Sequence, residues 1–280
     1  MSRLRRFTLG ATGAIVLGGL WSFWWEPASL ILREEVLTVA WPATTGPRIA
    51  VLTDLHVGSP FNDLDRLRDI VRRTNAAGPD VVCILGDLVI HGVRGGTFVP
   101  PEEIATVLAD LKAPAGVFAV LGNHDAWFDH DRVERALRKN QVRVVEDTAV
   151  RIGVGGSAWW LAGVSDLWTG RHDINAALAA VEDDGRPVIL MTHNPDLFPD
   201  VPPRVALTLA GHTHGGQVWL PIIGRPIVPS EFGQRFAAGH IVEDGRHLYV
   251  ATGVGTSILP VRLGVRPAVP VIRIVPLTRQ

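Results

Sequence analysis

The feature that most constrains this fold is a series of short apolar runs that each end in carboxylate, amide or imidazole side chains. Uncharged runs bounded by turn residues are typical of strands buried on both faces. Amphipathic stretches separate the first three runs, as at 64–78, where arginines lie opposite an apolar face. This alternation predicts a parallel sheet with helices on its faces. The five runs lie at 48–54, 80–87, 116–125, 186–193 and 204–212.

The second half of the chain is richer in strands than in helices. One convincing helix is predicted there, at 174–184, and residues 221–236 form a long segment without a regular pattern that contains three prolines. No linker or low-complexity segment follows residue 46, so one domain is expected over 47–280. The additional strands are predicted at 142–147, 149–153, 159–164, 216–220, 239–244, 247–253 and 268–275.

The amino-terminal segment has the pattern of a membrane anchor or an export signal. Arg3, Arg5 and Arg6 precede 19 residues without a charge, Phe7–Trp25. At about 1.5 Å per residue, such a helix nearly crosses a hydrocarbon core of roughly 30 Å. We therefore expect an anchor or a twin-arginine-like signal at 1–27, then a tether and a first strand at 28–46, with the remaining chain outside the cytoplasm. A buried core helix is the alternative.

Charge and cysteine content exclude two classes of function. The net charge of −1 gives no general affinity for polyanions, so no nucleic-acid partner is expected. Cys83 is the only cysteine, which excludes an internal disulfide and a thiolate metal cluster. Its apolar neighbours predict a small filler of a buried strand.

The polar side chains at the strand ends are the candidates for a functional site. Ligands of parallel α/β sheets bind beyond the carboxyl ends of the strands, because only those ends present polar groups. Taken singly, each residue has an ordinary explanation as a helix cap, a turn residue or a buried histidine. Five such strand ends together indicate one site. Its candidates are Asp54, His56, Asp87, Asn123, His124, Asp125, His193, His212 and His214.

These side chains point to a metal site. Carboxylate, imidazole and amide ligands without sulfur suit Mn²⁺, Fe²⁺, Zn²⁺ or Co²⁺. Four histidines argue against Ca²⁺ or Mg²⁺ as the only ion, because both prefer oxygen ligands. The ligands are too many for one tetrahedral ion, whereas two ions about 3.5–4 Å apart, bridged by a carboxylate, would use them all.

The motifs D-L-H (54–56), G-D (86–87), G-N-H-D (122–125), His193 and G-H-T-H (211–214) occur in an order that resembles the calcineurin-like metallophosphoesterase superfamily. The resemblance covers residues 48 to about 255. Together with the amino-terminal segment, it is strongest to the bacterial membrane-associated or exported phosphodiesterase branch. It implies a four-layer α/β/β/α sandwich of two mixed sheets, placed on the periplasmic side of the inner membrane or exported.

The resemblance also implies roles for individual residues. One ion would be held by Asp54, His56 and His214, and the other by Asn123, His193 and His212, with Asp87 bridging both. His124, oriented by Asp125, would be the general acid on the leaving oxygen. The family often has an acidic residue three positions after the bridging aspartate, where this chain has Ile90 followed by His91. That difference concerns the residues that would hold the metal ligands in place more than it concerns metal binding itself.

The resulting hypothesis is a dinuclear metal-dependent phosphodiesterase. It would hydrolyse a phosphodiester or pyrophosphate, including lipid-linked ones, by attack of a metal-bound hydroxide. The alternatives are a phosphomonoesterase or nuclease with the same site, and a non-catalytic membrane-tethered scaffold. Further residues near the motif loops are weaker candidates for a substrate pocket: Trp127, Trp159, Trp160, Trp168, Arg171 and His172.

Overall fold

Two six-stranded sheets form the body of the molecule in the computed structural model, which describes residues 3–42, 45–170 and 172–277. The first sheet contains β1 (Ile31–Val39), β2 (Arg48–Leu52), β3 (Val81–Leu85), β4 (Val117–Val120), β5 (Arg143–Val144) and β12 (Ala268–Pro276). The second contains β6 (Thr148–Val154), β7 (Ser157–Gly163), β8 (Val188–Met191), β9 (Val205–Ala210), β10 (Gly239–Glu243) and β11 (Arg246–Val250). The strand orders are β1-β12-β2-β3-β4-β5 and β10-β11-β9-β8-β7-β6.

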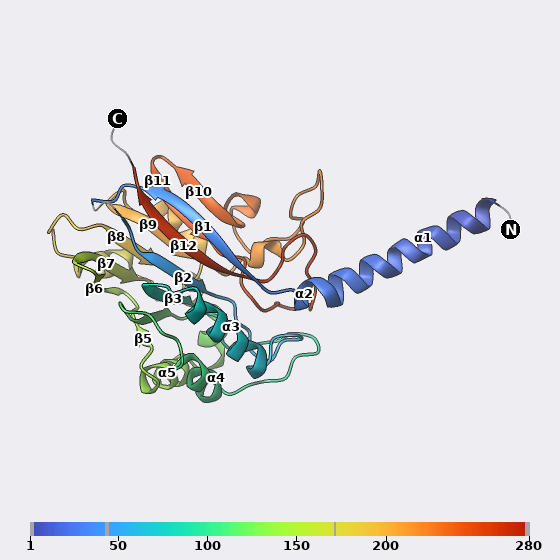
Figure 1. The fold of residues 1–280 in the computed structure, drawn as a ribbon, viewed down its shortest axis with the longest axis horizontal. Helices are drawn as coiled ribbons and strands as arrows, with labels where there is room; N and C mark the ends of the chain where they lie inside the picture. The colour runs from blue at the N-terminus through green and yellow to red at the C-terminus, as the bar shows by residue number, and fades with distance from the viewer. Residues whose placement is uncertain (1–2, 43–44, 171, 278–280) are drawn as a thin grey trace.

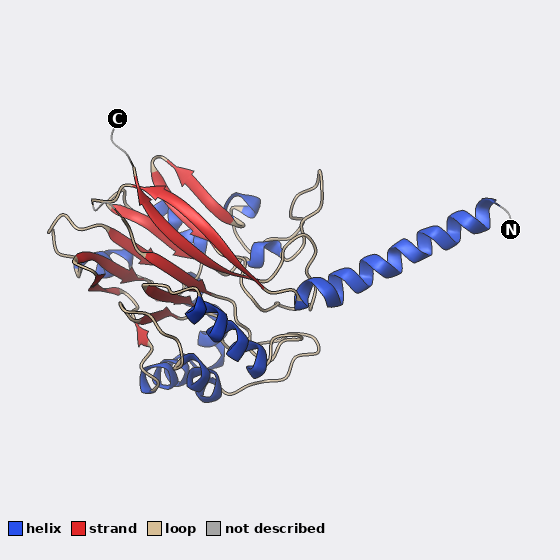
Figure 2. Ribbon diagram, in the orientation of Figure 1, coloured by secondary structure: helices blue, strands red, loops and turns tan. Residues whose placement is uncertain are grey.

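Both sheets mix parallel and antiparallel neighbours, and helices cover their outer faces (Figures 1 and 2). The four-layer α/β/β/α sandwich is thereby confirmed. The helices are α1 (Arg3–Leu20), α2 (Glu26–Ala28), α3 (Leu64–Ala76), α4 (Pro101–Leu108), α5 (Asn123–Lys139) and α6 (Ile174–Ala179). Shorter helical turns are η1 (Trp21–Trp25), η2 (Leu167–Thr169), η3 (Pro195–Asp200), η4 (His214–Gly216) and η5 (Gly233–Phe236).

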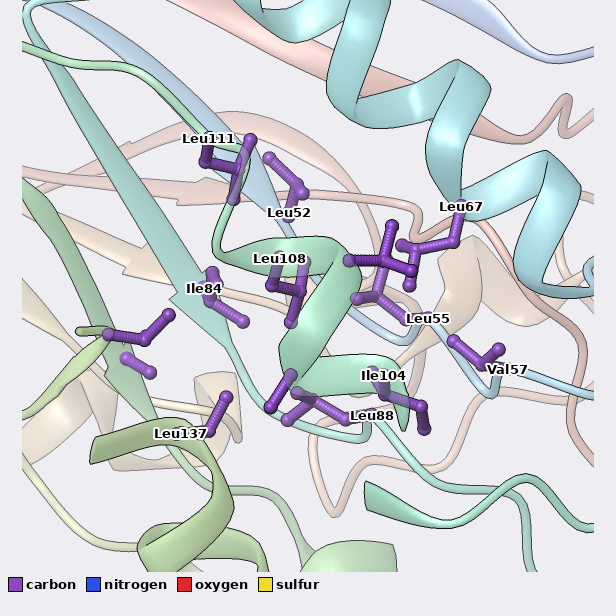
Figure 3. Close-up of a cluster of buried hydrophobic side chains, with 14 of the residues drawn as sticks. Leu52, Leu55, Val57, Leu67, Ile84, Leu88, Ile104, Leu108, Leu111 and Leu137 are labelled. Atoms are coloured by element: carbon purple, nitrogen blue, oxygen red, sulfur yellow. The ribbon is translucent and has the colours of Figure 1, made fainter. Parts of the chain in front are cut away.

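Alternation along the buried strands divides the core into layers. In β2, Ala50 and Leu52 pack toward the helices, whereas Ile49 and Val51 pack between the two sheets. Figure 3 shows the helix-facing cluster, in which Leu67 of α3 and the α4 side chains meet the sheet. A fully buried leucine contributes about 1.5–3 kcal/mol relative to an exposed one, so these layers fix the positions of the strand ends.

The layer between the sheets contains Cys83, which is buried as the sequence predicts. Trp159 also lies in this layer, and its neighbour Trp160 lies in the outer layer of the second sheet, against α6 and η3. Both tryptophans are core residues, so their assignment as pocket candidates was wrong.

The predicted helix at 64–78 is confirmed as α3. The side chain of Asp63 accepts a hydrogen bond from the Arg66 amide and caps its first turn. The strand predicted at 216–220 was wrong, because this segment leaves η4 as a loop with two isolated bridges, Val218 to Leu263 and Leu220 to Gly224. Glycines 215 and 216 both have positive φ, which turns the chain away from an extended conformation.

The amino-terminal helical run extends away from the sheets (Figure 1). Within the described ranges 3–42, 45–170 and 172–277, no helix combines the length and apolar content needed to cross a membrane. The expected span over Phe7–Trp25 is divided between α1 and η1, and α1 includes three arginines among its 18 residues. The run ends against the body, where Ser22 and Glu26 are buried and the Ser22 carbonyl accepts a bond from the Arg262 amide (2.9 Å).

Candidate metal site at the strand ends

The predicted site residues converge at the carboxyl ends of strands from both sheets. Asp54 and Asp87 follow the parallel neighbours β2 and β3, and Asn123 begins the helix after β4. His193 follows β8, while His212 and His214 follow β9. All seven predicted metal ligands are buried, with at most 4% of their surface exposed.

One cluster consists of Asp54, His56 and His214, whose ligand atoms lie within 4.8 Å of one another. His214 Nε2 is 3.4 Å from Asp54 Oδ1 and 3.2 Å from His56 Nε2. The rings of His56 and His214 stack, with centroids 5.0 Å apart. These atoms are arranged around a common centre.

A second cluster consists of Asp87, His193 and His212, again within 4.8 Å. His193 Nε2 lies 3.1 Å from His212 Nδ1 and 3.1 Å from Asn123 Oδ1. Asn123 therefore belongs to this cluster.

Asp87 lies between the two clusters. Its Oδ2 is 3.5 Å from His56 Nε2 and 3.3 Å from His193 Nε2. Its Oδ1 accepts a hydrogen bond from the His124 amide (2.9 Å). One carboxylate is thus within reach of both groups of histidines.

The chemistry of the donor set fits cations. The Nδ1 atoms of His56 and His193 face the carbonyls of Val89 (3.2 Å) and Leu85 (2.6 Å), which only accept hydrogen bonds. In the neutral rings Nδ1 then carries the proton, and each Nε2 atom has a free lone pair. These lone pairs meet other acceptors, and His212 Nε2 is buried with no partner. A divalent cation at each cluster would satisfy them.

The histidine pKa values agree with this reading. Burial lowers the pKa of His56 and of His212 to about 3, so both rings are neutral at pH 7, which is the form that binds metal. Burial alone would raise the pKa of Asp87, but the charge and hydrogen bond of His193 hold it well below its usual value. The attraction of Asp87 in turn overcomes burial and raises the pKa of His193 to about 10. A positive charge is therefore favoured beside Asp87, whether a proton or a metal ion supplies it.

The backbone is strained where these ligands lie. Five of the seven have left-handed φ: Asp54 (49°), His56 (39°), Asp87 (56°), His212 (69°) and His214 (51°). Such conformations cost roughly 1–3 kcal/mol each in non-glycine residues and cluster at functional sites. Close packing adds to the constraint, because a Cβ on Gly122 would lie 2.2 Å from Asp87 Oδ1.

His124 and Asp125 differ in their surroundings. The His124 side chain is 11% exposed, its Nε2 lies 3.9 Å from Asp87 Oδ2, and burial lowers its pKa. The Asp125 carboxylate accepts bonds from the amides of Asp87 (2.8 Å), Leu88 (2.9 Å) and Val89 (3.2 Å), whereas His124 Nδ1 has no partner. The resemblance implied that Asp125 orients the His124 ring, but no hydrogen bond joins the side chains of these two described residues. Asp125 instead positions the turn that contains Asp87.

The site opens into a cavity of about 370 Å³, here called the site mouth. Trp127 and Trp168 line it, as the sequence suggested, and stack with centroids 6.2 Å apart. His172 borders a separate pocket near η3, and Arg171 lies outside the described residues. The site mouth also includes His91, whose ring lies 6.0 Å from that of His124.

Sequence reasoning missed two residues beside the site. Asp166 follows β7, the parallel neighbour of β8, so the same strand-end pattern would have found it. Arg262 is fully buried behind Asp54, and its guanidinium donates to the carbonyls of Thr252 (3.0 Å) and Gly255 (2.5 Å). No local pattern distinguishes Arg262 from a surface arginine.

The comparison with known families decides what kind of protein carries this site. Residues 47–216 match the family model described as calcineurin-like phosphoesterase. The chain belongs to the calcineurin-like phosphoesterase family. Membership agrees with the resemblance of the motifs and makes the protein a metal-dependent phosphoester hydrolase.

Relatives of this phosphoesterase include bacterial proteins of similar length. It is 29% identical over 289 residues to the uncharacterized metallophosphoesterase YkuE of Bacillus subtilis, covering 97% of this chain and 96% of that protein. It is 31% identical to the phosphodiesterase YaeI of Escherichia coli, covering 81% and 82%. The NAD nucleotidase of Haemophilus influenzae shares the fold, with a TM-score of 0.51 and 13% identity over 76% of this chain and 46% of that one.

Proposed function

We propose that this calcineurin-like phosphoesterase is a dinuclear phosphodiesterase, with Mn²⁺, Fe²⁺ or Zn²⁺ as its ions. The observation that carries the proposal is the position of Asp87, whose Oδ2 lies within 3.5 Å of a histidine nitrogen in each cluster. A carboxylate in this position suits a bridge between two ions. The similarity to a protein named as a phosphodiesterase supports the diester as substrate class.

The ions would neutralise the phosphoryl group and lower the pKa of a bound water. The protein's own side chains do the remaining work. His124 borders the site mouth and lies beside Asp87, so it is placed to donate a proton to a leaving oxygen. Asp125 keeps the Asp87 turn in place through its amide hydrogen bonds, which makes Asp125 a positioning residue.

The metal content is the first test. Protein stripped of metal is reloaded with Mn²⁺, Zn²⁺ or Fe²⁺, analysed for bound metal, and assayed with bis(p-nitrophenyl) phosphate and p-nitrophenyl phosphate. We expect two ions per chain and preference for the diester. Asp87→Asn should abolish turnover and lose metal, whereas Asp110→Asn, the same change at an exposed site, should do neither. One ion at most, or near-normal activity of Asp87→Asn, would contradict the dinuclear assignment.

We further propose that the protein acts outside the cytoplasm at the bacterial inner membrane, on substrates that include lipid-linked diesters. Ile227 (77% exposed) and Ile258 (71%) border the site mouth. Trp21 of the amino-terminal run lines a separate pocket together with Trp219 and Pro221, so the run lies beside the loop that follows η4. Relatives named as transmembrane proteins with a metallophosphoesterase domain agree with membrane association.

The location and the lipid preference have separate tests. A reporter fused after residue 280 should function only outside the cytoplasm, and cytoplasmic activity alone would refute the topology. Lipid-linked diester in mixed micelles should give a higher kcat/KM than its soluble analogue. An Ile227→Ser, Ile258→Ser variant should lose that advantage and keep its activity on bis(p-nitrophenyl) phosphate.

A further inference from the structure

A second pocket, here called the acidic pocket, adjoins the site mouth. It has a volume of about 690 Å³ and shares Trp127 and Trp168 with the site mouth. Gly122, which packs against Asp87, also lines it. Among the residues that the structure describes, no lysine or arginine lines this pocket, and His130 is its one basic group. Its carboxylates are Asp129, Asp131, Glu146, Asp147 and Asp166.

Asp166 distinguishes this pocket from a solvated acidic surface. The residue is 3% exposed, and its Oδ2 accepts a hydrogen bond from the Trp168 amide (2.9 Å). Its Oδ1 is buried and has no hydrogen-bond partner. An unpaired buried carboxylate oxygen is costly, so a donor is expected to meet it.

The other two inner carboxylates are already satisfied. Glu146 accepts bonds from the Leu121 amide (2.8 Å) and from His130 Nε2 (2.8 Å). Asp147 accepts bonds from the amide and hydroxyl of Ser165 (3.1 and 2.6 Å). Asp166 Oδ1 is therefore the point at which the pocket lacks a donor.

The two tryptophans add a second recognition element. Trp127 is 50% exposed and Trp168 is 45% exposed, so both rings border the two pockets while remaining accessible. Trp168 also lies edge-on to His212, with centroids 4.3 Å apart. Aromatic faces attract cations, and more strongly where the contact is shielded from water. A cation held here would lie next to a phosphoryl group at the metal site.

We propose that the acidic pocket binds an ammonium group on the alcohol part of the substrate, which makes the substrate an amino-alcohol phosphodiester. The inference rests on the proposed phosphodiesterase function. An ammonium donates to Asp166 Oδ1 and balances the excess of carboxylates. The same negative potential repels a phosphomonoester dianion, which carries more charge than a diester and no cation to offset it.

A pair of isosteric substrates isolates the charge. 2-Aminoethyl p-nitrophenyl phosphate and propyl p-nitrophenyl phosphate share shape and leaving group, and they differ in the primary ammonium, which can donate to Asp166 Oδ1. We expect kcat/KM about tenfold higher for the charged ester, which lies between the values of exposed and desolvated cation–aromatic contacts. Asp166→Asn should bring the ratio close to one while keeping a side-chain acceptor for the Trp168 amide. Asp110→Asn should keep the wild-type ratio.

A second variant and a binding measurement keep the test independent of folding and of turnover. Asp129→Asn with Asp131→Asn changes only exposed rim residues and should also lower the ratio. Calorimetry on the protein without added metal should show binding of ethanolamine but not of 1-propanol, with loss of binding in Asp166→Asn.

The outcomes separate the two proposals. Equal kcat/KM for both esters without ethanolamine binding would overturn the acidic-pocket proposal and leave diester hydrolysis standing. Ethanolamine binding that depends on Asp166, without hydrolysis of any diester, would overturn the proposed function alone. Preference for a glycerol ester over the ammonium ester would mean that the acidic pocket binds a polyol and not a cation. Glycerophosphoethanolamine and phosphatidylethanolamine in micelles then distinguish a soluble diester from a lipid headgroup, and at least one must be hydrolysed.

Discussion

Gly122→Ala tests how closely the bridging carboxylate is packed. Gly122 has φ −104° and ψ 179°, which alanine adopts without strain, so the substitution acts only through contacts of the new methyl group. That methyl would lie 2.2 Å from Asp87 Oδ1 and 2.8 Å from His193 Cε1. Ordinary contacts begin near 3.4 Å, so Asp87 must move by roughly 1 Å.

A displacement of this size at the reacting groups lowers kcat/KM by about 10²-fold. Overpacking should also cost about 1–3 kcal/mol of unfolding free energy. The assay is kcat/KM for bis(p-nitrophenyl) phosphate with Mn²⁺, together with bound metal and a thermal melt. Activity is measured at a temperature at which the melt shows the variant folded.

Gly18→Ala is the matched control, because a Cβ at Gly18 meets nothing within 4 Å. It should leave kcat/KM unchanged and should not lower the melting temperature, because alanine favours the helix in which Gly18 lies. A folded Gly122→Ala protein with kcat/KM within about threefold of wild type and a full metal complement would refute the reasoning. It would mean that Asp87 does not need its present position.

Three further variants test neighbouring features. His124→Ala should lower kcat by roughly 10²–10⁴ with metal content intact, and the loss should be smaller with a nitrophenolate leaving group; equal losses would argue against proton donation. Arg262→Met should lower the unfolding free energy by at least about 3 kcal/mol in urea melts, because it leaves buried carbonyls unpaired, whereas Arg273→Met on the surface should not. The hydrogen bond to Glu146 raises the pKa of His130 to about 9. The pair should therefore add about 1 kcal/mol to the unfolding free energy below pH 6.5, and this contribution should disappear as the pH rises through 9. His130→Gln should flatten that part of the stability profile, and an unchanged slope would exclude the pair as its source.

The metal-site candidates were predictable because their positions follow from strand geometry. Asp54, Asp87 and His193 each come two residues after the end of a buried strand, and parallel register brings such residues to one edge. Asp166 follows the same rule and was overlooked because one carboxylate after a strand resembles a turn residue. The strand-end pattern thus predicts where site residues lie more reliably than it predicts what each of them does.

Other features depend on contacts that no local pattern records. The hydrogen-bond partners of Arg262 are carbonyls of a loop up to ten residues away. The family resemblance implied that Asp125 orients His124, yet α5 directs the Asp125 carboxylate to the turn after β3. The error at 216–220 arose because apolar spacing also occurs in loops whose glycines prevent an extended backbone.

The position of β12 sets the order in which the first sheet is assembled. This strand lies between β1 and β2, pairing with β1 from Ile31↔Ala268 to Val39↔Pro276 and with β2 at three positions. During synthesis, β1 leaves the ribosome early but has no neighbour in the sheet until residues 268–276 have emerged. The amino-terminal strand must therefore wait for nearly the whole chain, and its exposed edge is available to chaperones or to export factors throughout that interval.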